Sequence, residues 1–139
     1  MRVRNFIVAD AVSPGLQGKM FVHGGGVTSI AAAAFPYVHP QLGLLLTLVY
    51  EGPEDDIEQR VQVAIENNEG DEVATVLDLE TDKPSEPFEE RKSFLLIHLL
   101  GEMAGLQFEK PGRYWMVLKL NGEELDRMML DATLVEMPS

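Results

Sequence analysis

Apolar and polar residues alternate along much of this chain, and this two-residue period is typical of half-buried β-strands. Residues 60–66 carry an apolar side chain at every second position, and residues 73–79 repeat the alternation. The intervening residues 67–71, Asn-Asn-Glu-Gly-Asp, include residue types that tolerate a positive φ. The two runs therefore predict a β-hairpin.

A second hairpin is marked more clearly further along the chain. Alternation over residues 114–120 is followed by Asn121-Gly122, and a returning strand is expected from about Leu125 to Val135. The Asn-Gly pair favours a type I′ turn, because both central residues of that turn must adopt a positive φ.

Five further segments are predicted as strands from their apolar content and flanking turn residues: 2–8, 19–23, 27–33, 42–50 and 94–100. An alternative for Ala31–Ala34 is one turn of helix, because alanine is the strongest helix former. No alternation of strands with helices is found, which argues against Rossmann-like folds and α/β barrels. A total of about eight or nine short strands predicts an all-β fold. We expect a single antiparallel β-sandwich domain over residues 1–139, with Greek-key connections of the immunoglobulin-like or jelly-roll-like kind.

The charge balance narrows the expected partners. The 139 residues include 11 Lys and Arg against 23 Asp and Glu, so the formal net charge is -12. A surface this acidic repels phosphate backbones, so nucleic acid is not expected as a partner. The longest apolar run, residues 42–50, is far shorter than the roughly 20 residues of a membrane-spanning helix, and a convincing signal peptide is missing. We therefore expect a cytoplasmic protein without membrane insertion.

An ordered set of short motifs spans most of the chain: Ala9-Asp10-Ala11, Gly18-Lys19, Gly24–Gly26, Phe35-Pro36, His39-Pro40-Gln41, Phe108-x-x-Pro111-Gly112-x-Tyr114 and Asn121-Gly122. In this order the motifs resemble an uncharacterised family of small bacterial β-sandwich proteins, which is classed as a domain of unknown function. The resemblance runs from about Val3 to Val135. It implies the sandwich fold and brings no activity, cofactor or catalytic residue with it.

Three motifs that suggest enzymatic chemistry lack the context that the chemistry needs. His23-Gly24-Gly25-Gly26 matches the oxyanion-hole string of some esterases, but the chain has no Gly-x-Ser-x-Gly nucleophile motif. Gly18-Lys19 is followed by Met20, where a phosphate-binding loop requires Ser or Thr. The three histidines do not have the spacing of a helical zinc pair, and the chain contains no cysteine. We therefore expect neither enzymatic activity nor a cofactor.

An acidic loop after residue 50 is the best candidate for ion binding. It offers several hard oxygen ligands within one short segment, which is the ligand type that Ca²⁺ prefers. Their spacing does not follow the known calcium-loop pattern, so they are weak candidates. The residues are Glu51, Glu54, Asp55, Asp56 and Glu58. Our alternative hypothesis is a small-ligand or Ca²⁺-binding module that uses this loop, residues 51–58.

A surplus of apolar residues supports a different role. In residues 42–50 and 94–100, the leucines of one face suffice for a core and leave further apolar side chains on the other face. Burial of that surplus between subunits is the basis of our main hypothesis, a non-enzymatic interaction or assembly module that forms a homo-oligomer or binds another protein. The candidate interface residues are Leu45, Val49, Leu95, Ile97, Leu99 and Trp115.

Overall fold

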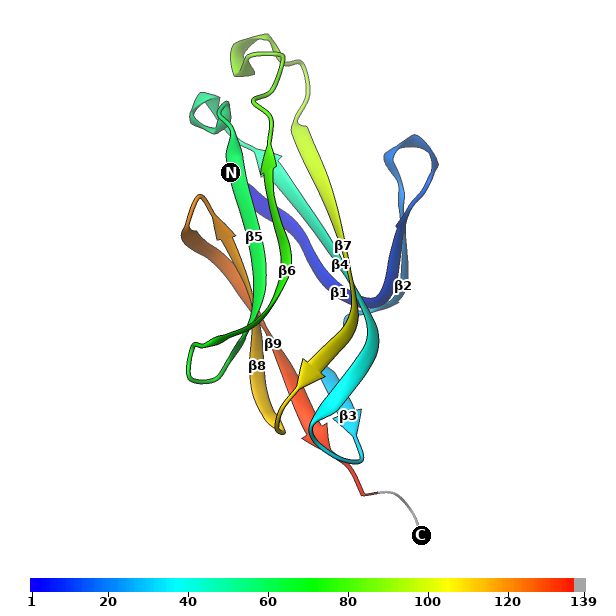
Figure 1. Cartoon of the computed structure of the whole chain (residues 1–139). Coiled ribbons are helices and arrows are strands. Elements are labelled where there is room, and N and C mark those ends of the chain that lie inside the picture. The colour runs from blue at the N-terminus through cyan, green and yellow to red at the C-terminus, as the bar shows by residue number, and fades with distance from the viewer. Residues whose placement is uncertain (137–139) are drawn as a thin grey trace.

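The computed structural model describes residues 1–136, and these are built mainly from β-strands (Figure 1). The strands are β1 (Arg2–Pro14), β2 (Met20–Gly25), β3 (Ser29–Ala32), β4 (Tyr37–Tyr50), β5 (Gln59–Asn67), β6 (Glu72–Thr81), β7 (Leu95–Phe108), β8 (Gly112–Leu120) and β9 (Glu123–Leu134). Short 3₁₀ helices lie in three connections: η1 (Leu16–Gly18), η2 (Pro53–Asp55) and η3 (Phe88–Glu90). The helical alternative for Ala31–Ala34 is wrong, because β3 extends through Ala32 with Ile30 and Ala32 buried.

The strands form two sheets that face each other. The first sheet has the order β2-β1-β4-β7, and the second has the order β3-β9-β8-β5-β6. Strands β4 and β7 pair in the first sheet, whereas the β5–β6 hairpin between them in sequence belongs to the second, as in Greek-key sandwiches. The predicted all-β sandwich is confirmed. One pairing departs from the antiparallel pattern among the described strands: β3 runs parallel to β9.

Both predicted hairpins are present, with the expected turn chemistry. Asn121 has φ 52° and Gly122 has φ 86°, so the β8–β9 turn has the two positive φ angles that its Asn-Gly sequence predicts. In the β5–β6 turn, the backbone amide of Asn67 donates to the Asp71 carbonyl oxygen at 2.9 Å, and Gly70 has φ 87°. The local sequence therefore determines both turns.

The main hydrophobic core lies between the two sheets. One layer comes from the leucines of β4 that face the second sheet, and the other comes mainly from β5 and β8. Fully buried members are Leu42, Leu44, Leu46, Leu48, Val61, Val63, Ile65, Met116 and Leu118. Because such a side chain contributes about 1.5–3 kcal/mol when it leaves water, this double layer supplies most of the hydrophobic stabilisation.

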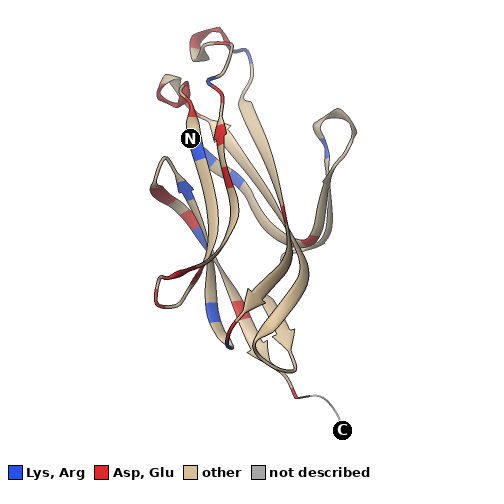
Figure 2. Ribbon diagram, in the orientation of Figure 1, with Lys and Arg blue, Asp and Glu red and all other residues tan. Residues whose placement is uncertain are grey.

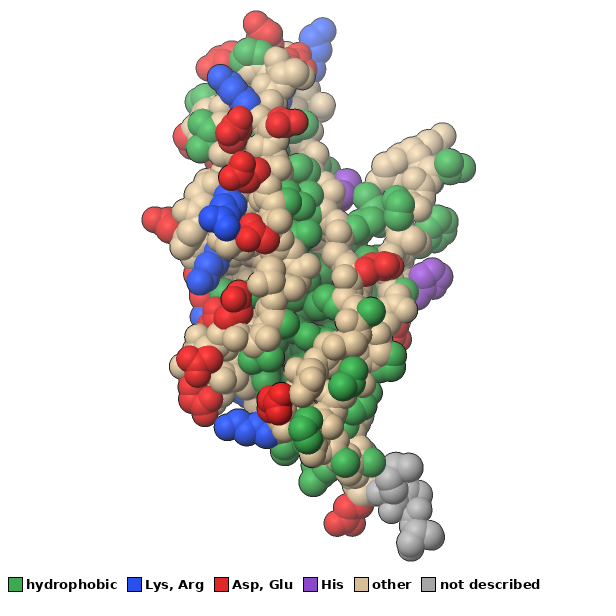
Figure 3. Space-filling model, in the orientation of Figure 1, with side chains coloured by type: hydrophobic (Ala, Val, Ile, Leu, Met, Phe, Trp, Pro, Cys, Tyr) green, Lys and Arg blue, Asp and Glu red, His purple; other side chains and the backbone are tan. Residues whose placement is uncertain are grey.

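The outer face of the first sheet is covered in part by the chain itself. Strand β1 pairs with β4 as far as Ala9 and then bends, so the β1–β2 hairpin runs beside this face while its tip stands apart from the sandwich (Figures 1 and 3). Leu45 of β4 forms a second, smaller cluster with Ala9 and Val12, and Ile7, Met20 and Leu100 pack against it. Part of the apolar surplus noted in the sequence is therefore buried within one chain.

Gly43 of β4 is required by a close approach of two strands. A Cβ atom at this position would lie 2.9 Å from the backbone nitrogen of Val12 on the neighbouring strand. We expect Gly43→Ala to lower the free energy of unfolding by about 1–3 kcal/mol, because the backbone of β1 must move to admit the methyl group.

Gly101 of β7 is the matched control for Gly43. Its added Cβ would meet nothing closer than 3.5 Å, at the Leu44 side chain. Urea unfolding of both variants checks the prediction, and Gly101→Ala should change the stability by less than about 1 kcal/mol. Equal stability of the two variants would contradict the close packing of β1 on β4.

Charged residues are distributed unequally over the two sheets (Figure 2). Strand β4 carries none, and β7 carries Glu102 alone, whereas β5, β6, β8 and β9 of the second sheet each carry charged residues, and further charges cluster in the loops. The space-filling view shows the same contrast, with charged side chains over the second sheet and apolar ones along the seam between the sheets (Figure 3). None of the helical segments in residues 1–136 has the length and hydropathy that a membrane crossing requires.

Candidate ligand-binding site

A hollow of about 580 Å³ lies at the end of the sandwich where β4 ends and β7 begins, and we call it the end pocket. In Figure 1 this is the upper end, where the connection that contains η3 leads into β7. The volume falls within the range of small-molecule sites in proteins. The lining residues are Tyr50, Phe88, Glu89, Arg91, Lys92, Ser93, Phe94 and Leu95.

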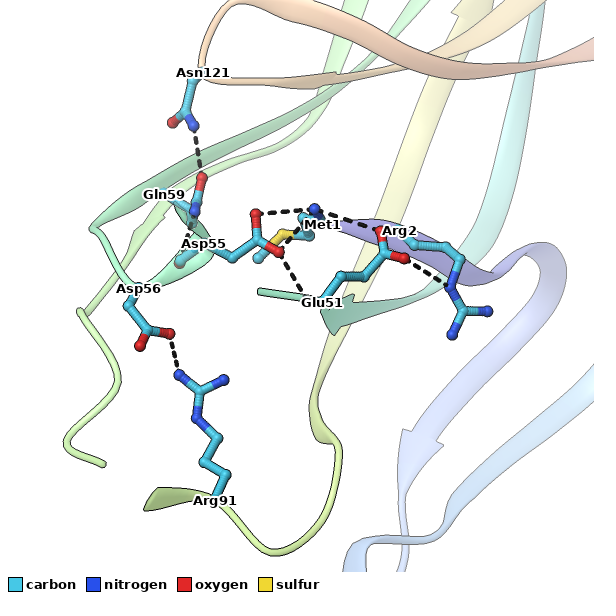
Figure 4. Close-up of polar contacts among 8 residues, drawn as sticks. All are labelled: Met1, Arg2, Glu51, Asp55, Asp56, Gln59, Arg91 and Asn121. Carbon is cyan, nitrogen blue, oxygen red and sulfur yellow. Dashed lines mark hydrogen bonds and ion pairs between the residues drawn. The ribbon is translucent and has the colours of Figure 1, made fainter. Parts of the chain in front are cut away.

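Arg91 is the polar centre of the end pocket. Its side chain is only 7% exposed and forms an ion pair with Asp56 through Nη2 (Figure 4). Its Nε donates a hydrogen bond to the Glu86 carbonyl oxygen at 3.1 Å. The guanidinium carbon lies 5.8 Å from the Tyr50 ring centroid and 5.7 Å from the Phe88 ring centroid. These distances are within the cation–π range, so the arginine is held by two rings as well as by polar partners.

The second terminal nitrogen of Arg91, Nη1, has no partner. Within residues 1–136, it is the one buried side-chain nitrogen or oxygen atom without a hydrogen bond. An unpaired buried donor costs about 1–3 kcal/mol, and buried polar groups in native proteins are seldom left in this state.

Asp56 connects the acidic loop to the pocket. One carboxylate oxygen pairs with Arg91, and the other accepts a hydrogen bond from the Phe88 backbone amide at 2.8 Å. Since Phe88 begins η3, a single carboxylate fixes both the helix and the arginine. The connection between β6 and β7 is therefore held by a residue of the loop between β4 and β5.

The rim of the end pocket exposes aromatic surface. Phe94 is 80% exposed and Phe88 is 37% exposed, whereas Tyr50 at the inner wall is buried at 4%. Large exposed apolar side chains beside a hollow often mark a binding site. The arrangement offers aromatic surface to an apolar ligand, next to a buried arginine.

Asp55, next to Asp56, has a structural role (Figure 4). Its side chain is 9% exposed, and Oδ1 accepts a hydrogen bond from the Met1 ammonium group at 2.9 Å. Its Oδ2 accepts one from the Glu51 backbone amide at 2.8 Å. The Gln59 side chain donates to the Asp55 carbonyl oxygen at 3.0 Å and so ties the loop to β5.

The pKa of Asp55 lies below its usual value. Burial of the carboxyl group raises this pKa, but the hydrogen bond and charge of the Met1 ammonium group lower it, as do the backbone amides of Glu51 and Gly52. The lowering contributions outweigh the burial, because each of them stabilises the charged carboxylate. Asp55 therefore acts as a charged anchor for the loop.

The acidic loop does not assemble a metal site. Asp55 and Asp56 are used by the ammonium group and by Arg91, and Glu51 lies 3.6 Å from both the Met1 ammonium nitrogen and Arg2 Nε. Glu54 and Glu58 are exposed. Among residues 1–136, no three acidic or histidine side chains converge as metal ligands would, so the Ca²⁺ alternative has no preformed site.

The predicted interface residues do not form one surface, and this part of the prediction needs correction. Leu45 and Val49 are 6% and 1% exposed within a single chain. Ile97 and Leu99 pack against the main core, on the opposite face of the sheet. Register explains the difference: Leu45 pairs with Leu100, so the β7 residues that share its face are the even-numbered ones. Leu95 lines the end pocket instead.

Trp115 lies on the other sheet, far in sequence from the remaining candidates. The Arg113 and Arg127 guanidinium carbons lie 5.9 and 5.4 Å from its ring centroid, and its Nε1 donates to Asn68 at 3.2 Å. Its outward direction on β8 agrees with the alternation in the sequence. Neighbours of its own chain partly cover it, and it lies on a different sheet from Leu45 and Val49.

Sequence reasoning missed the residues that matter most in the end pocket. Phe88 and Arg91 lie between the predicted strands 73–79 and 94–100, and no role was assigned to either of them, while Phe94 was taken only as the first residue of the second strand. One available indication was a large aromatic residue on each side of a basic pair within a charged loop. The pairing of Arg91 with Asp56 spans 35 positions, and no local pattern predicts it.

The fold and the end pocket define a small β-sandwich protein with a candidate ligand-binding hollow at one end of the sandwich. The chain belongs to a family of unknown function, DUF6941, which matches residues 4–133. This confirms the expected relation to an uncharacterised family. No curated protein gives a match to the chain.

A solved structure with a similar fold is Pseudomonas fluorescens alkylpurine DNA glycosylase AlkC bound to DNA containing an abasic site analog, with a TM-score of 0.52. Sequence identity is 14%, and the alignment covers 94% of this chain. The chain spans about 30% of the length of that glycosylase chain. At this identity the likeness shows the fold alone.

This likeness corrects our expectation about partners. The acidic net charge was used to exclude nucleic acid, and the apolar surplus was used to favour a second copy or another protein. A similar fold occurs in a protein whose structure was solved with DNA, so that exclusion is wrong as it was drawn. Neither comparison supports self-association or a protein partner.

Proposed function

We propose that the chain is a non-enzymatic binding module that takes a small apolar ligand into the end pocket. The observation that carries the proposal is the combination of a hollow of about 580 Å³ with aromatic side chains at its rim. The proposal keeps the small-ligand alternative from the sequence analysis. It places the ligand in the end pocket, beside the connection between β6 and β7, and not at the carboxylates of residues 51–58. The proposal keeps the cytoplasmic location expected from the sequence.

Two further features support a binding role over a catalytic one. The pocket lining includes one serine and no histidine, so a nucleophile with an adjacent base is not assembled there. The lining surface is also mainly apolar, so a ligand with apolar surface is stabilised when that surface is buried against it.

Phe94→Ala tests the site directly. We expect titration with the neutral fluorescent dye N-phenyl-1-naphthylamine to give saturable enhancement of emission with the wild-type chain. Phe94→Ala should weaken dye binding about tenfold, since the ring can bury apolar area against the ligand. The substitution should leave the melting temperature nearly unchanged, because the ring is 80% exposed in the free protein.

Phe21→Ala is the matched control. Phe21 is an exposed phenylalanine on β2, in the β1–β2 hairpin, and it does not line the end pocket. Its removal should leave dye affinity unchanged. Weaker binding by Phe21→Ala together with normal binding by Phe94→Ala would place the dye on the hairpin and refute the proposed site.

A further inference from the structure

We infer that the ligand of the end pocket is a neutral aromatic compound with a hydrogen-bond acceptor, such as a ketone, and that Arg91 Nη1 is the donor to it. This inference rests on the proposed binding function and specifies its ligand. Its basis is the one unpartnered buried side-chain donor of residues 1–136, on a residue that lines the pocket.

The geometry of the guanidinium group assigns the free donor to the ligand. Arg91 Nη2 is committed to Asp56 and Nε to the Glu86 carbonyl oxygen, so two edges of the planar group are occupied. In Figure 4 the other terminal nitrogen points away from Asp56. An acceptor that reached Nη1 would complete the hydrogen bonding of the group and remove the cost of its burial.

The charges around the pocket favour a neutral acceptor over an anion. Asp56 already neutralises Arg91, and the side chain of Asp56 is itself only 13% exposed. Lys92 and Glu89, which also line the pocket, carry opposite charges. The local sum is zero within a chain of net charge -12, so an anionic ligand gains no net attraction.

The aromatic residues that line the end pocket favour an aromatic ring as the apolar part of the ligand. Tyr50 and Phe88 line the pocket with aromatic rings, which pack well against another aromatic ring, and Phe94 adds exposed apolar surface at the rim. Arg91 Nη1 has almost no exposed surface in the free protein, so a ligand reaches it only if a covering side chain turns aside. Phe88 is the candidate, because its ring centroid lies 5.7 Å from the guanidinium carbon and its side chain is 37% exposed.

Three closely related probes test the inference by competition with bound N-phenyl-1-naphthylamine. They are 2-acetylnaphthalene, 2-ethylnaphthalene and 2-naphthoate, which share the naphthalene body and differ in the acceptor. The ketone should bind the wild-type chain roughly tenfold more tightly than the ethyl compound, because hydrogen bonds to charged groups are among the stronger ones. It should also bind more tightly than the carboxylate.

Arg91→Lys is the informative variant. A lysine ammonium keeps the positive charge opposite Asp56 but lacks the forked geometry that places Nη1. We expect dye binding to persist and the preference for the ketone over the ethyl compound to disappear. Equal affinity of the wild-type chain for these two probes, or tighter binding of the carboxylate, would overturn the inference.

A second measurement keeps the inference testable if Arg91→Lys fails to fold. The infrared carbonyl stretch of 2-acetylnaphthalene bound to the wild-type chain should lie at or below its frequency in water, as for a carbonyl bonded to a charged donor. A shift to higher frequency, as in an apolar solvent, would show that Nη1 does not bind it. Failure of the dye itself to bind would overturn the proposed function, whereas dye binding without probe discrimination would overturn the ligand assignment alone.

Discussion

Replacement of Leu46 by alanine is expected to lower the free energy of unfolding by about 2–5 kcal/mol. Leu46 is 0% exposed and lies in the middle of β4, which pairs with β1 on one side and β7 on the other. Neither neighbouring strand can move inward to fill the space without losing its own pairing. The cavity should therefore remain largely open, which places the effect toward the upper part of the range.

Urea unfolding at neutral pH measures this effect, with Leu134→Ala as the matched control. Leu134 ends β9 and is 60% exposed, so its removal should change the stability by less than about 0.5 kcal/mol. A small effect for Leu46→Ala would contradict the position of β4 at the centre of the core.

Replacement of Asp55 by asparagine is expected to cost about 1.5–3 kcal/mol of stability at neutral pH. The carboxylate accepts hydrogen bonds from the Met1 ammonium group and from the Glu51 backbone amide. An asparagine amide has one oxygen, so its NH₂ group would face one of these donors. Glu58→Gln is the control, because it makes the same chemical change at an exposed position of the same loop.

The effect of Asp55→Asn should depend on pH in a defined direction. The folded-state pKa of Asp55 is lowered, so the unfolded chain takes up the proton first as the pH falls. The contribution of Asp55 is fully present above the unfolded-state pKa of about 3.9 and is lost as the pH falls through the folded-state pKa. Urea unfolding at pH 6 and below pH 4 should show the wild-type advantage shrinking. If the stability difference between wild type and Asp55→Asn grew as the pH fell, the pKa of Asp55 could not be lowered in the folded state.

Local sequence patterns predicted much of the fold, because the features that carry it act over short distances. Alternation over residues 60–66 and 114–120 and the Asn121-Gly122 turn correspond directly to β5, β8 and the β8–β9 hairpin. The lengths of β1, β4 and β7 were underestimated, since these strands continue through polar or proline-containing segments. In β4, for example, the strand begins at Tyr37, before Pro40.

The candidate site could not be predicted in the same way, because it depends on contacts between distant segments. The acidic loop was recognised as a candidate ion site, but no local pattern indicated that Asp56 pairs with Arg91 and Asp55 with the Met1 ammonium group. Leu45 was assigned to an interface because its cover, the bent β1–β2 hairpin, is a tertiary feature. Register across β4 and β7 likewise decides which leucines share a face.

The most direct test of the account is to locate the bound dye by nuclear magnetic resonance. ¹H–¹⁵N spectra of the labelled chain, recorded during titration with N-phenyl-1-naphthylamine, report which backbone amides change environment. We expect the largest shift changes at Tyr50 and at residues 88–95, with little change in β2 and at the β8–β9 turn. Changes concentrated in β2, or spread evenly over the chain, would contradict the end pocket as the ligand-binding site.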